Sequence, residues 1–322
     1  MCMNPRKHLQ ALLWLALCLC VWPSLASAER LPVKRYTAAD GLARDYIMRI
    51  VRDARGFLWF CTSEGLSRFD GYRFANYGVE QGLPGRVVHD VLATRGGVYW
   101  VATNNGVCRL DTAGRCVPGY RGASLGGHEI LDLFEDRQGV VWCGGFNAFY
   151  QLTSMHGEWV STAIPLGTEE FDVRGFAEDS HGALWMLKTG KLYWRQPDGR
   201  MEHFGSAEGL GAEFRPTGAL QMDRSGALWV ATLNGLYQFV PEPRLGAPAV
   251  AHIYTTREGL GFDGINDILP TADGALWVSL RNGAVSVAES NSSLGARRFH
   301  TYGKANGLPL AGVLAEDRDG NV

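Results

Sequence analysis

The sequence predicts an all-β fold built from repeated four-stranded units, and three observations support this prediction. Glycine is abundant, with 41 residues among 322, and aromatic residues recur between the glycines. A turn that contains glycine is followed three residues later by Trp at six places along the chain. The segments between these turns are short and apolar, and they show no 3.6-residue helical period. Many tight turns between short extended segments are typical of repetitive β structures.

The recurring Trp sets the length of the repeat. Successive Trp residues lie 41, 42, 43, 44 and 48 residues apart. They are Trp59, Trp100, Trp142, Trp185, Trp229 and Trp277. In most copies an Asp begins the preceding turn and bonds its own backbone, while Gly supplies the positive φ. We expect each Trp to fill the wedge between neighbouring units, which is a packing role rather than a ligand-binding one.

The first unit shows the strands that we expect in each repeat. They are predicted over residues 47–51, 58–62, 66–69 and 72–77. The turn at 53–56 reverses the first strand, and Asp70-Gly71 is a strong hairpin signal between the third and fourth. Four antiparallel strands in a period of roughly 40–45 residues form the blade of a β-propeller. The sequence therefore predicts six complete blades.

Both ends of the chain bear on how the ring closes. Residues 33–37, followed by Asp40-Gly41-Leu42, resemble the fourth strand and exit loop of a unit, and we expect them to complete the last blade. Residues 317–322 repeat the turn of a seventh unit. We therefore expect a truncated seventh blade in an incomplete seven-bladed ring. On this interpretation the chain is a fragment, and closing the ring takes about 25–30 further residues.

The N-terminal segment has the pattern of an export signal. Arg6 and Lys7 precede an apolar run from Leu9 to Val21, and Ala26-Ser27-Ala28 matches the small-x-small cleavage pattern. We predict a signal peptide over residues 1–28 and a propeller domain over residues 29–322, placed in the periplasm. The alternative is an uncleaved anchor, although the run is shorter than the roughly 20 residues that span a bilayer.

Charge and cysteine content limit the function classes. The formal net charge is −2, which gives no general attraction to nucleic acid. Four cysteines follow the signal peptide, and Cys108 and Cys116 flank a turn-like stretch. A disulfide across that hairpin and four buried thiols remain open alternatives. No C-x-x-C occurs, so the sequence supports neither a zinc site nor a redox motif.

Motifs for catalysis are weak. Residues 122–126 match G-x-S-x-G and His128 lies close, but a nucleophile elbow needs a strand, a sharp turn and a helix. This stretch lies in the loop between the second and third blades instead. The turn at 317–320 resembles a calcium loop without its bidentate Glu. The sequence therefore predicts no catalytic residue, no metal site and no cofactor.

A ligand site is best sought on one face of the ring. The loops from strand four to the next strand one lie there together with the loops from strand two to three, around the channel mouth. Our candidates are Arg44, Tyr46, Arg86, Asn104, Asn105, Lys188, Phe214, Arg215, Asn234 and Arg281, with Phe262 as a further aromatic. Several Arg residues around one mouth suit an anionic ligand such as an acidic sugar. The alternative is that these are solvated turn residues.

The repeat resembles the two-component regulator propeller repeat. The best copy, Asp53 to Gly71, follows the pattern Asp-x-x-Gly-x-Leu-Trp-x-x-Thr-x-x-Gly-Leu-x-Arg-Phe-Asp-Gly. Partial copies occupy 100–107 and 229–236, and the resemblance covers essentially the whole chain after the signal segment. The third and fourth units lack the Thr after Trp142 and Trp185, which leaves their turn geometry open.

This resemblance implies a role in signalling. Such propellers form the periplasmic sensor half of membrane proteins, followed by a β-sandwich, a transmembrane helix and a histidine kinase, diguanylate cyclase or DNA-binding output module. It implies a small-molecule or oligosaccharide ligand, a dimer in the full-length protein, and no catalysis or nucleic-acid binding by this segment.

The alternative is a stand-alone secreted propeller, acting as a lyase-type enzyme or as an assembly scaffold. An enzyme needs a His, Glu or Tyr cluster in the channel. His89 and Glu213 stand near the starts of first strands, but the sequence shows no partner beside them.

Overall fold

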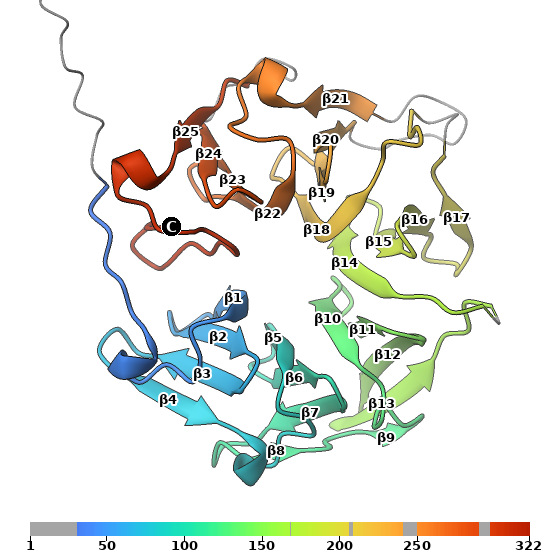
Figure 1. The fold of residues 1–322 in the computed structure, drawn as a ribbon. Coiled ribbons are helices and arrows are strands. Elements are labelled where there is room, and N and C mark those ends of the chain that lie inside the picture. Colours follow the sequence, from blue (N-terminus) through green and yellow to red (C-terminus); the bar gives the residue numbers. More distant parts are fainter. Residues whose placement is uncertain (1–30, 168, 206–208, 241–249, 290–296) are drawn as a thin grey trace, which may run out of the picture.

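The computed structural model describes residues 31–167, 169–205, 209–240, 250–289 and 297–322. Six antiparallel sheets stand around a central channel, each with its first strand innermost (Figure 1). The chain is thus an all-β propeller with six four-stranded blades, as the Trp spacing predicted. The predicted signal peptide at 1–28 lies outside the described residues.

The strands of the first three blades follow the chain in order. Blade 1 holds β1 (Ile47–Arg52), β2 (Leu58–Thr62), β3 (Gly65–Phe69) and β4 (Phe74–Tyr77). Blade 2 holds β5 (Val88–Ala93), β6 (Tyr99–Thr103), β7 (Gly106–Leu110) and β8 (Cys116–Val117). Blade 3 holds β10 (Ile130–Glu135), β11 (Val141–Gly145), β12 (Ala148–Met155) and β13 (Glu158–Ala163), with β9 (Arg121–Gly122) added parallel to β13.

The other three blades repeat this order. Blade 4 holds β14 (Val173–Glu178), β15 (Leu184–Lys188), β16 (Lys191–Arg195) and β17 (Met201–His203). Blade 5 holds β18 (Pro216–Met222), β19 (Leu228–Thr232), β20 (Gly235–Phe239) and β21 (Val250–Tyr254). Blade 6 holds β22 (Ile265–Pro270), β23 (Leu276–Leu280), β24 (Val285–Ala288) and β25 (His300–Tyr302). Short 3₁₀ turns, η1 (Ala38–Asp40), η2 (Val79–Gln81), η4 (Thr256–Glu258) and η5 (Lys304–Asn306), stand in the loops.

The repeated Asp and Trp act together. In four blades the Asp that opens the β-turn accepts a hydrogen bond from the indole N–H six residues later, at 2.8–3.1 Å. The pairs are Asp53–Trp59, Asp136–Trp142, Asp179–Trp185 and Asp223–Trp229. Each of these indoles is buried between blades, so the predicted packing role is confirmed. The hydrogen bond fixes the turn to the strand that follows it.

The turn between the second and third strands depends on a Thr. In blades 1, 2 and 5 the Thr hydroxyl donates to the glycine carbonyl three residues on and accepts the N–H two residues on. Blades 3 and 4 lack this Thr, and their turns instead place Asn147 and Thr189 at φ 49°. The departure from the repeat pattern therefore changes the turn and leaves the blade intact.

The cysteines divide into two kinds. Cys108 and Cys116 form a disulfide across the β7–β8 hairpin, with their Cα atoms 5.5 Å apart. Cys61 and Cys143 are buried free thiols. The sequence had left both arrangements open, and the structure combines them.

The two ends of the chain differ from the expectation. Residues 33–37 form no strand, so they do not pair as the fourth strand of a last blade. Residues 308–322 also hold no strand, although the turn predicted at 317–320 is present and Gly320 N–H donates to the Asp317 carbonyl. A seventh blade is therefore not formed within the described residues.

Candidate functional site: the central channel

The channel is lined by the innermost strands, and a recurrent β-bulge decides which side chains face it. In β1, β5, β10 and β22 one residue is skipped in the pairing with the neighbouring strand. The skipped residues are Met48, His89, Leu131 and Asn266, and all four line the cavity. A bulge re-aims a side chain, so the same local irregularity presents a different chemical group from each of these four blades.

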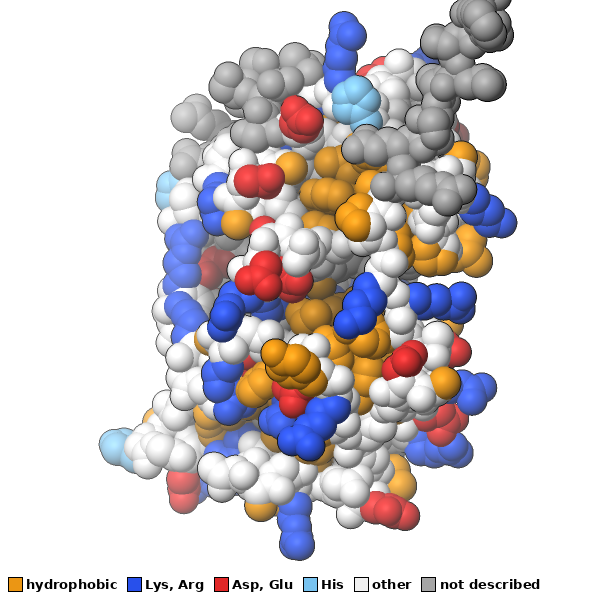
Figure 2. Space-filling view, turned by 90° about the vertical axis from the view of Figure 1, so that its left-hand side faces the viewer, with side chains coloured by type: hydrophobic (Ala, Val, Ile, Leu, Met, Phe, Trp, Pro, Cys, Tyr) orange, Lys and Arg blue, Asp and Glu red, His pale blue; other side chains and the backbone are white. Residues whose placement is uncertain are grey.

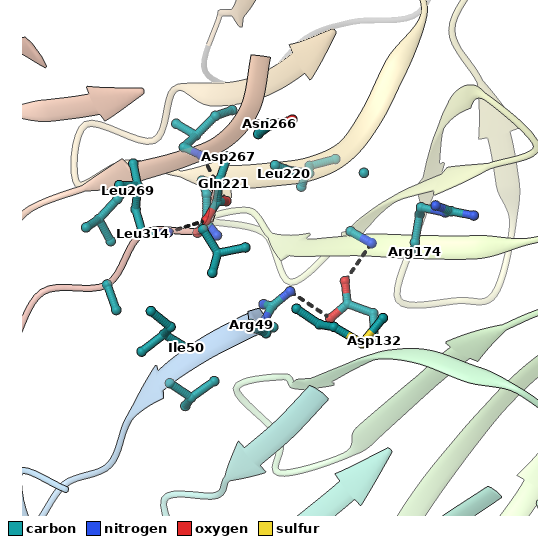
Figure 3. Close-up of a pocket in the computed structure, with 18 of the residues that line it drawn as sticks. Arg49, Ile50, Asp132, Arg174, Leu220, Gln221, Asn266, Asp267, Leu269 and Leu314 are labelled. Carbon is teal, nitrogen blue, oxygen red and sulfur yellow. Dashed lines mark hydrogen bonds and ion pairs between the residues drawn. The ribbon is translucent and has the colours of Figure 1, made fainter. Parts of the chain in front are cut away.

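The cavity has a volume of about 530 Å³, and its walls are mixed in character (Figure 3). They come mainly from β1, β14, β18, β22 and residues 313–316. Polar groups from Arg49, Asp132, Gln221 and Asn266 alternate with aliphatic side chains and backbone. A cavity of this size and polarity fits a small polar ligand.

Arg49 of blade 1 forms ion pairs with carboxylates of blades 2 and 3. Its Nε lies 3.0 Å from Asp90 Oδ1, and its Nη1 lies 3.6 Å from Asp132 Oδ1. Both carboxylates are buried, whereas 41% of the Arg49 side chain is exposed to the channel. The Asp90 carboxylate raises the pKa of Arg49, so the guanidinium is always charged. Burial raises the pKa of Asp90 to about 8, and Arg49 opposes that rise.

The channel carboxylates also connect neighbouring blades through the backbone. Asp90 Oδ2 accepts the N–H of Leu133 at 2.9 Å, and Asp132 Oδ2 accepts the N–H of Gly175 at 2.7 Å. Asp267 Oδ2 accepts the N–H of Leu314 at 2.9 Å in the same manner (Figure 3). Burial raises the pKa of Asp267. These groups hold the blades in register, which makes the channel a rigid frame for a ligand.

A second polar group lies at the start of β5. His89 Nε2 is 2.9 Å from Glu129 Oε1, and the His89 side chain is largely buried. Burial lowers the pKa of His89, Glu129 opposes this, and the charge of Arg174 lowers it further. Arg174 lines the same cavity and is paired with Asp172, with Nη2 and Oδ2 2.6 Å apart. The carboxylate partner of His89 could not be predicted from the sequence, because Glu129 is 40 residues away and precedes the first strand of the next blade.

The rim residues predicted from the sequence lie on one face. The turns between the second and third strands lie beside the loops that lead into the first strands. Three hydrogen bonds show this, Asn105 to Pro84, Asn234 to Glu213 and Arg281 to Gly264. None of the ten candidates lines the channel cavity. The ten candidates therefore lie outside the cavity.

These candidates differ in solvent exposure and in whether they form ion pairs. Arg44, Arg215 and Arg281 are exposed and form no ion pair among the described residues, and Tyr46 is 68% exposed. Arg86 is paired with Glu64.

The remaining candidates serve the local fold. Asn104 Oδ1 accepts the Val87 N–H, and the Asn105 and Asn234 amides donate to the carbonyls of Pro84 and Glu213. Lys188 Nζ donates to the Leu166 carbonyl, and Phe214 packs on the core between blades 4 and 5.

The G-x-S-x-G stretch forms no nucleophile site. It begins at Gly122, the last residue of β9, and continues in a loop without a helix, where the Ser124 hydroxyl accepts the N–H of Gly126. His128 Nε2 lies 3.2 Å from the Tyr150 hydroxyl instead. This agrees with the loop predicted from the sequence.

Sequence reasoning missed the channel charges, although a signal exists. In blades 1, 2, 3 and 6 the third position of the innermost strand is charged, at Arg49, Asp90, Asp132 and Asp267, and an apolar residue follows each of them. A charge recurring inside an apolar strand at one repeat position predicts a shared polar axis.

Two features are absent from the described part of the chain. It contains no group of three or more His, Cys, Asp or Glu side chains placed to hold a metal ion. It also contains no helix with the length and apolar character needed to cross a membrane.

Comparison with known proteins supports the fold more than the family. No known family model matches the chain, and no curated protein is similar to it in sequence. Among solved structures, it resembles the extracellular domain assigned to a hybrid two component system of B. thetaiotaomicron. That match has a TM-score of 0.71 and 21% identity, and it covers 87% of this chain and 37% of that one. The chain thus spans little more than a third of that domain.

Lyases share the same fold. A streptogramin B lyase matches with a TM-score of 0.65 and 15% identity, covering 87% of this chain and 90% of the lyase. A virginiamycin B lyase from Staphylococcus aureus matches with a TM-score of 0.62 and 15% identity, covering 80% of this chain and 83% of the lyase. At such identities these likenesses establish the β-propeller and leave the function open.

Proposed function

We propose that the chain is the periplasmic ligand-sensing propeller of a transmembrane two-component-type signalling protein. It performs no catalysis itself and passes ligand occupancy to a C-terminal output module, which is a histidine kinase, a diguanylate cyclase or a DNA-binding regulator. The observation that carries this proposal is the likeness to an extracellular domain of a hybrid two component system over 87% of the chain. The Asp-x-x-Gly-x-Leu-Trp repeat supports it independently.

The proposed ligand is a small anion, such as an acidic oligosaccharide, held at the channel mouth. Three exposed guanidiniums, those of Arg44, Arg215 and Arg281, face solvent on the entry-loop face without a carboxylate partner among the described residues. Guanidinium groups bind carboxylate and sulfate oxygens in a bidentate manner. The cavity below the mouth admits the uncharged part of such a ligand.

Two experiments test this proposal. Sequencing the reading frame past Val322 should show a β-sandwich, an apolar span of roughly 20 residues and an output module. A stop codon within about one repeat would instead indicate a free propeller.

The ligand class is tested by thermal shift with a panel of acidic oligosaccharides. The triple variant Arg44→Gln, Arg215→Gln, Arg281→Gln should lose the shift. The matched control changes Arg73, Arg115 and Arg200 to Gln, which lie in the hairpin turns at the opposite end of the blades. Equal losses in both triples would point to non-specific charge attraction and against this site.

A lyase is the second candidate, and one observation favours it. His89 lies beside Glu129 at the channel, and a His–carboxylate pair is suited to proton transfer. The purified chain would be incubated with quinupristin, the compound bound to the Staphylococcus aureus lyase, and followed by mass spectrometry. Conversion that disappears in His89→Ala and is retained in His181→Ala would favour the lyase over the sensor.

A further inference from the structure

An arginine in the turn after the first strand connects some blades to the next blade. In blade 2, Arg95 donates to a backbone carbonyl in the turn of blade 3, and its Nε lies 3.3 Å from Glu135 Oε2. In blade 3, Arg137 donates to a carbonyl in the turn of blade 4, and its Nε lies 3.8 Å from Glu178 Oε2. Each Glu is the last residue of a first strand, and it neutralises the arginine that reaches over from the preceding blade.

Blade 5 has the same arginine without the acid. Arg224 donates to the Ala272 carbonyl in the turn of blade 6, as Arg95 does to the turn of blade 3. However, the first strand of blade 6 ends in Pro270 where that of blade 3 ends in Glu135. Because proline offers no carboxylate, Arg224 forms no ion pair with any described residue.

The unpaired charge of Arg224 borders a second cavity, on the face of the ring that carries these turns. This turn-face cavity has a volume of about 390 Å³, and Arg52 and Arg297 line it together with Arg224. Arg52 donates to the Asp317 carbonyl, and the Arg297 guanidinium lies 5.5 Å from the centroid of the Trp229 ring. Neither of them forms an ion pair within the described ranges. Three guanidinium groups that lack carboxylate partners therefore line one cavity.

The carboxylates around the turn-face cavity are already hydrogen-bonded. Asp223, in its wall, accepts the Trp229 indole N–H at 2.8 Å and two N–H groups of its own turn. Glu316, also in the wall, accepts the Ala272 N–H at 3.1 Å. The adjacent Asp273 accepts a hydroxyl and an N–H within its own turn. Three arginines against two bonded carboxylates leave the wall with a positive charge.

The turn-face cavity adjoins the central channel from the side opposite the predicted ligand mouth. Arg52, Gln221, Leu269 and Glu316 line both spaces. The turns after the first strands stand at the other end of those strands from the entry loops, so the two faces are separate. In side view, basic side chains stand along both edges of the molecule, so positive charge is not confined to the face of the mouth (Figure 2).

We propose that the turn-face cavity is a second anion site, which binds a tetrahedral oxyanion group, phosphate or sulfate, either free or as the ester of a small organic molecule. Guanidinium groups donate paired N–H bonds to the oxygens of such groups. The side chains of Leu269, Pro270 and Leu276 supply an apolar wall for the organic part of an ester. The site uses none of the rim arginines, so it does not depend on the ligand proposed for the mouth.

Isothermal titration calorimetry with inorganic phosphate, inorganic sulfate and glucose 6-phosphate tests this site, with chloride at equal ionic strength as the background. We expect saturable binding. Tighter binding of the ester would assign the site to an organic phosphate, and equal binding would assign it to the free ion. Arg224→Gln should weaken binding about tenfold or more, because it removes a charged donor. Arg95→Gln is the matched control, since Arg95 holds the same turn position but is paired with Glu135, and it should leave binding unchanged.

A second variant removes the site without removing an arginine. Pro270→Glu restores the acid of the other two junctions, so the introduced carboxylate should pair with Arg224 and abolish binding while Tm is kept or raised. If this variant does not fold, Arg224→Gln decides. Binding that survives Pro270→Glu in a folded protein would overturn the proposal, as would the absence of saturable binding or an equal loss in Arg95→Gln. The rim triple Arg44→Gln, Arg215→Gln, Arg281→Gln should still bind phosphate, and a loss there would move the anion to the mouth and refute a second site.

Discussion

Exchanging Asp and Thr between two blades tests whether the Asp–Trp hydrogen bond stabilises the blade. In blade 3 the Trp142 indole donates to Asp136 Oδ2 at 2.8 Å, and Asp136 Oδ1 accepts two backbone N–H groups of the turn. Blade 2 has Thr94 in place of Asp. Its hydroxyl accepts only the Val98 N–H, and the buried Nε1 of Trp100 has no partner among the described residues. Blade 2 therefore lacks the Asp–Trp hydrogen bond that blade 3 has.

The magnitudes follow from the groups left unpaired. Asp136→Thr removes the acceptor of a buried indole N–H, which costs about 1–3 kcal/mol, and one backbone hydrogen bond worth about 1 kcal/mol. We expect a loss of about 2–4 kcal/mol, or a fall in Tm of about 4–8 °C for a domain of this size. Thr94→Asp should add the missing bond in blade 2 and gain about 1–2 kcal/mol. Asp53 shows that a buried carboxylate is tolerated in this setting, because its hydrogen bonds to Trp59 and Tyr99 outweigh burial and lower its pKa.

Differential scanning calorimetry and urea unfolding measure both changes. Thr94→Asp is repeated in a Trp100→Phe background, where no indole N–H remains and the gain should vanish. Thr271→Asp in blade 6 is a matched control, since Trp277 there is half-buried and reaches water. If Thr94→Asp stabilises equally with Phe at position 100, the hydrogen bond is not the cause. A loss of stability in Thr94→Asp would refute the reasoning outright.

Three further predictions concern the channel and the loops. The pKa of Asp90 is raised to about 8 in the folded state, so its contribution to the free energy of unfolding is present at low pH and is lost as pH rises toward 8. The variant Asp90→Asn should therefore flatten that part of the pH–stability profile, which urea titrations at several pH values measure. Reducing the Cys108–Cys116 disulfide, or Cys108→Ser, should cost about 2–3 kcal/mol because it frees a short loop, and unfolding with and without reductant measures this. A Cβ at Gly145 would lie 2.0 Å from the Glu129 carbonyl, so Gly145→Ala should destabilise by about 1–3 kcal/mol or more and disturb the His89 pair, visible in the His89 NMR titration.

The blades could be predicted from the sequence because their signals are local. In four of the six blades the turn places Asp, Gly and Trp within seven residues, and these residues interact with one another in the fold, as Asp53, Gly56 and Trp59 do. The second strand of blade 1 was predicted at its observed bounds, Leu58–Thr62, for this reason. Register within a blade follows from two-residue alternation, which a short segment already displays.

The candidate site could not be predicted in the same way because its contacts are non-local. Arg49 meets Asp90 and Asp132 across about one and two repeats, and Glu129 reaches His89 from the next blade. The sequence neighbours of Arg49 do not by themselves distinguish a channel charge from a solvated one, and only the recurrence of a charge at the same repeat position in other blades does so. The rim residues were chosen by loop position alone, which does not reveal that Asn105 and Asn234 bond backbone carbonyls.

Residues 313–316 form one wall of the cavity, and they are held to blade 6 by the Asp267–Leu314 and Glu316–Ala272 hydrogen bonds. A ligand that fills the cavity would order this wall further, and the free energy of that ordering would oppose binding. Such a ligand should therefore raise the hydrogen-exchange protection of residues 313–316, whereas a ligand held only by the rim arginines should leave it unchanged.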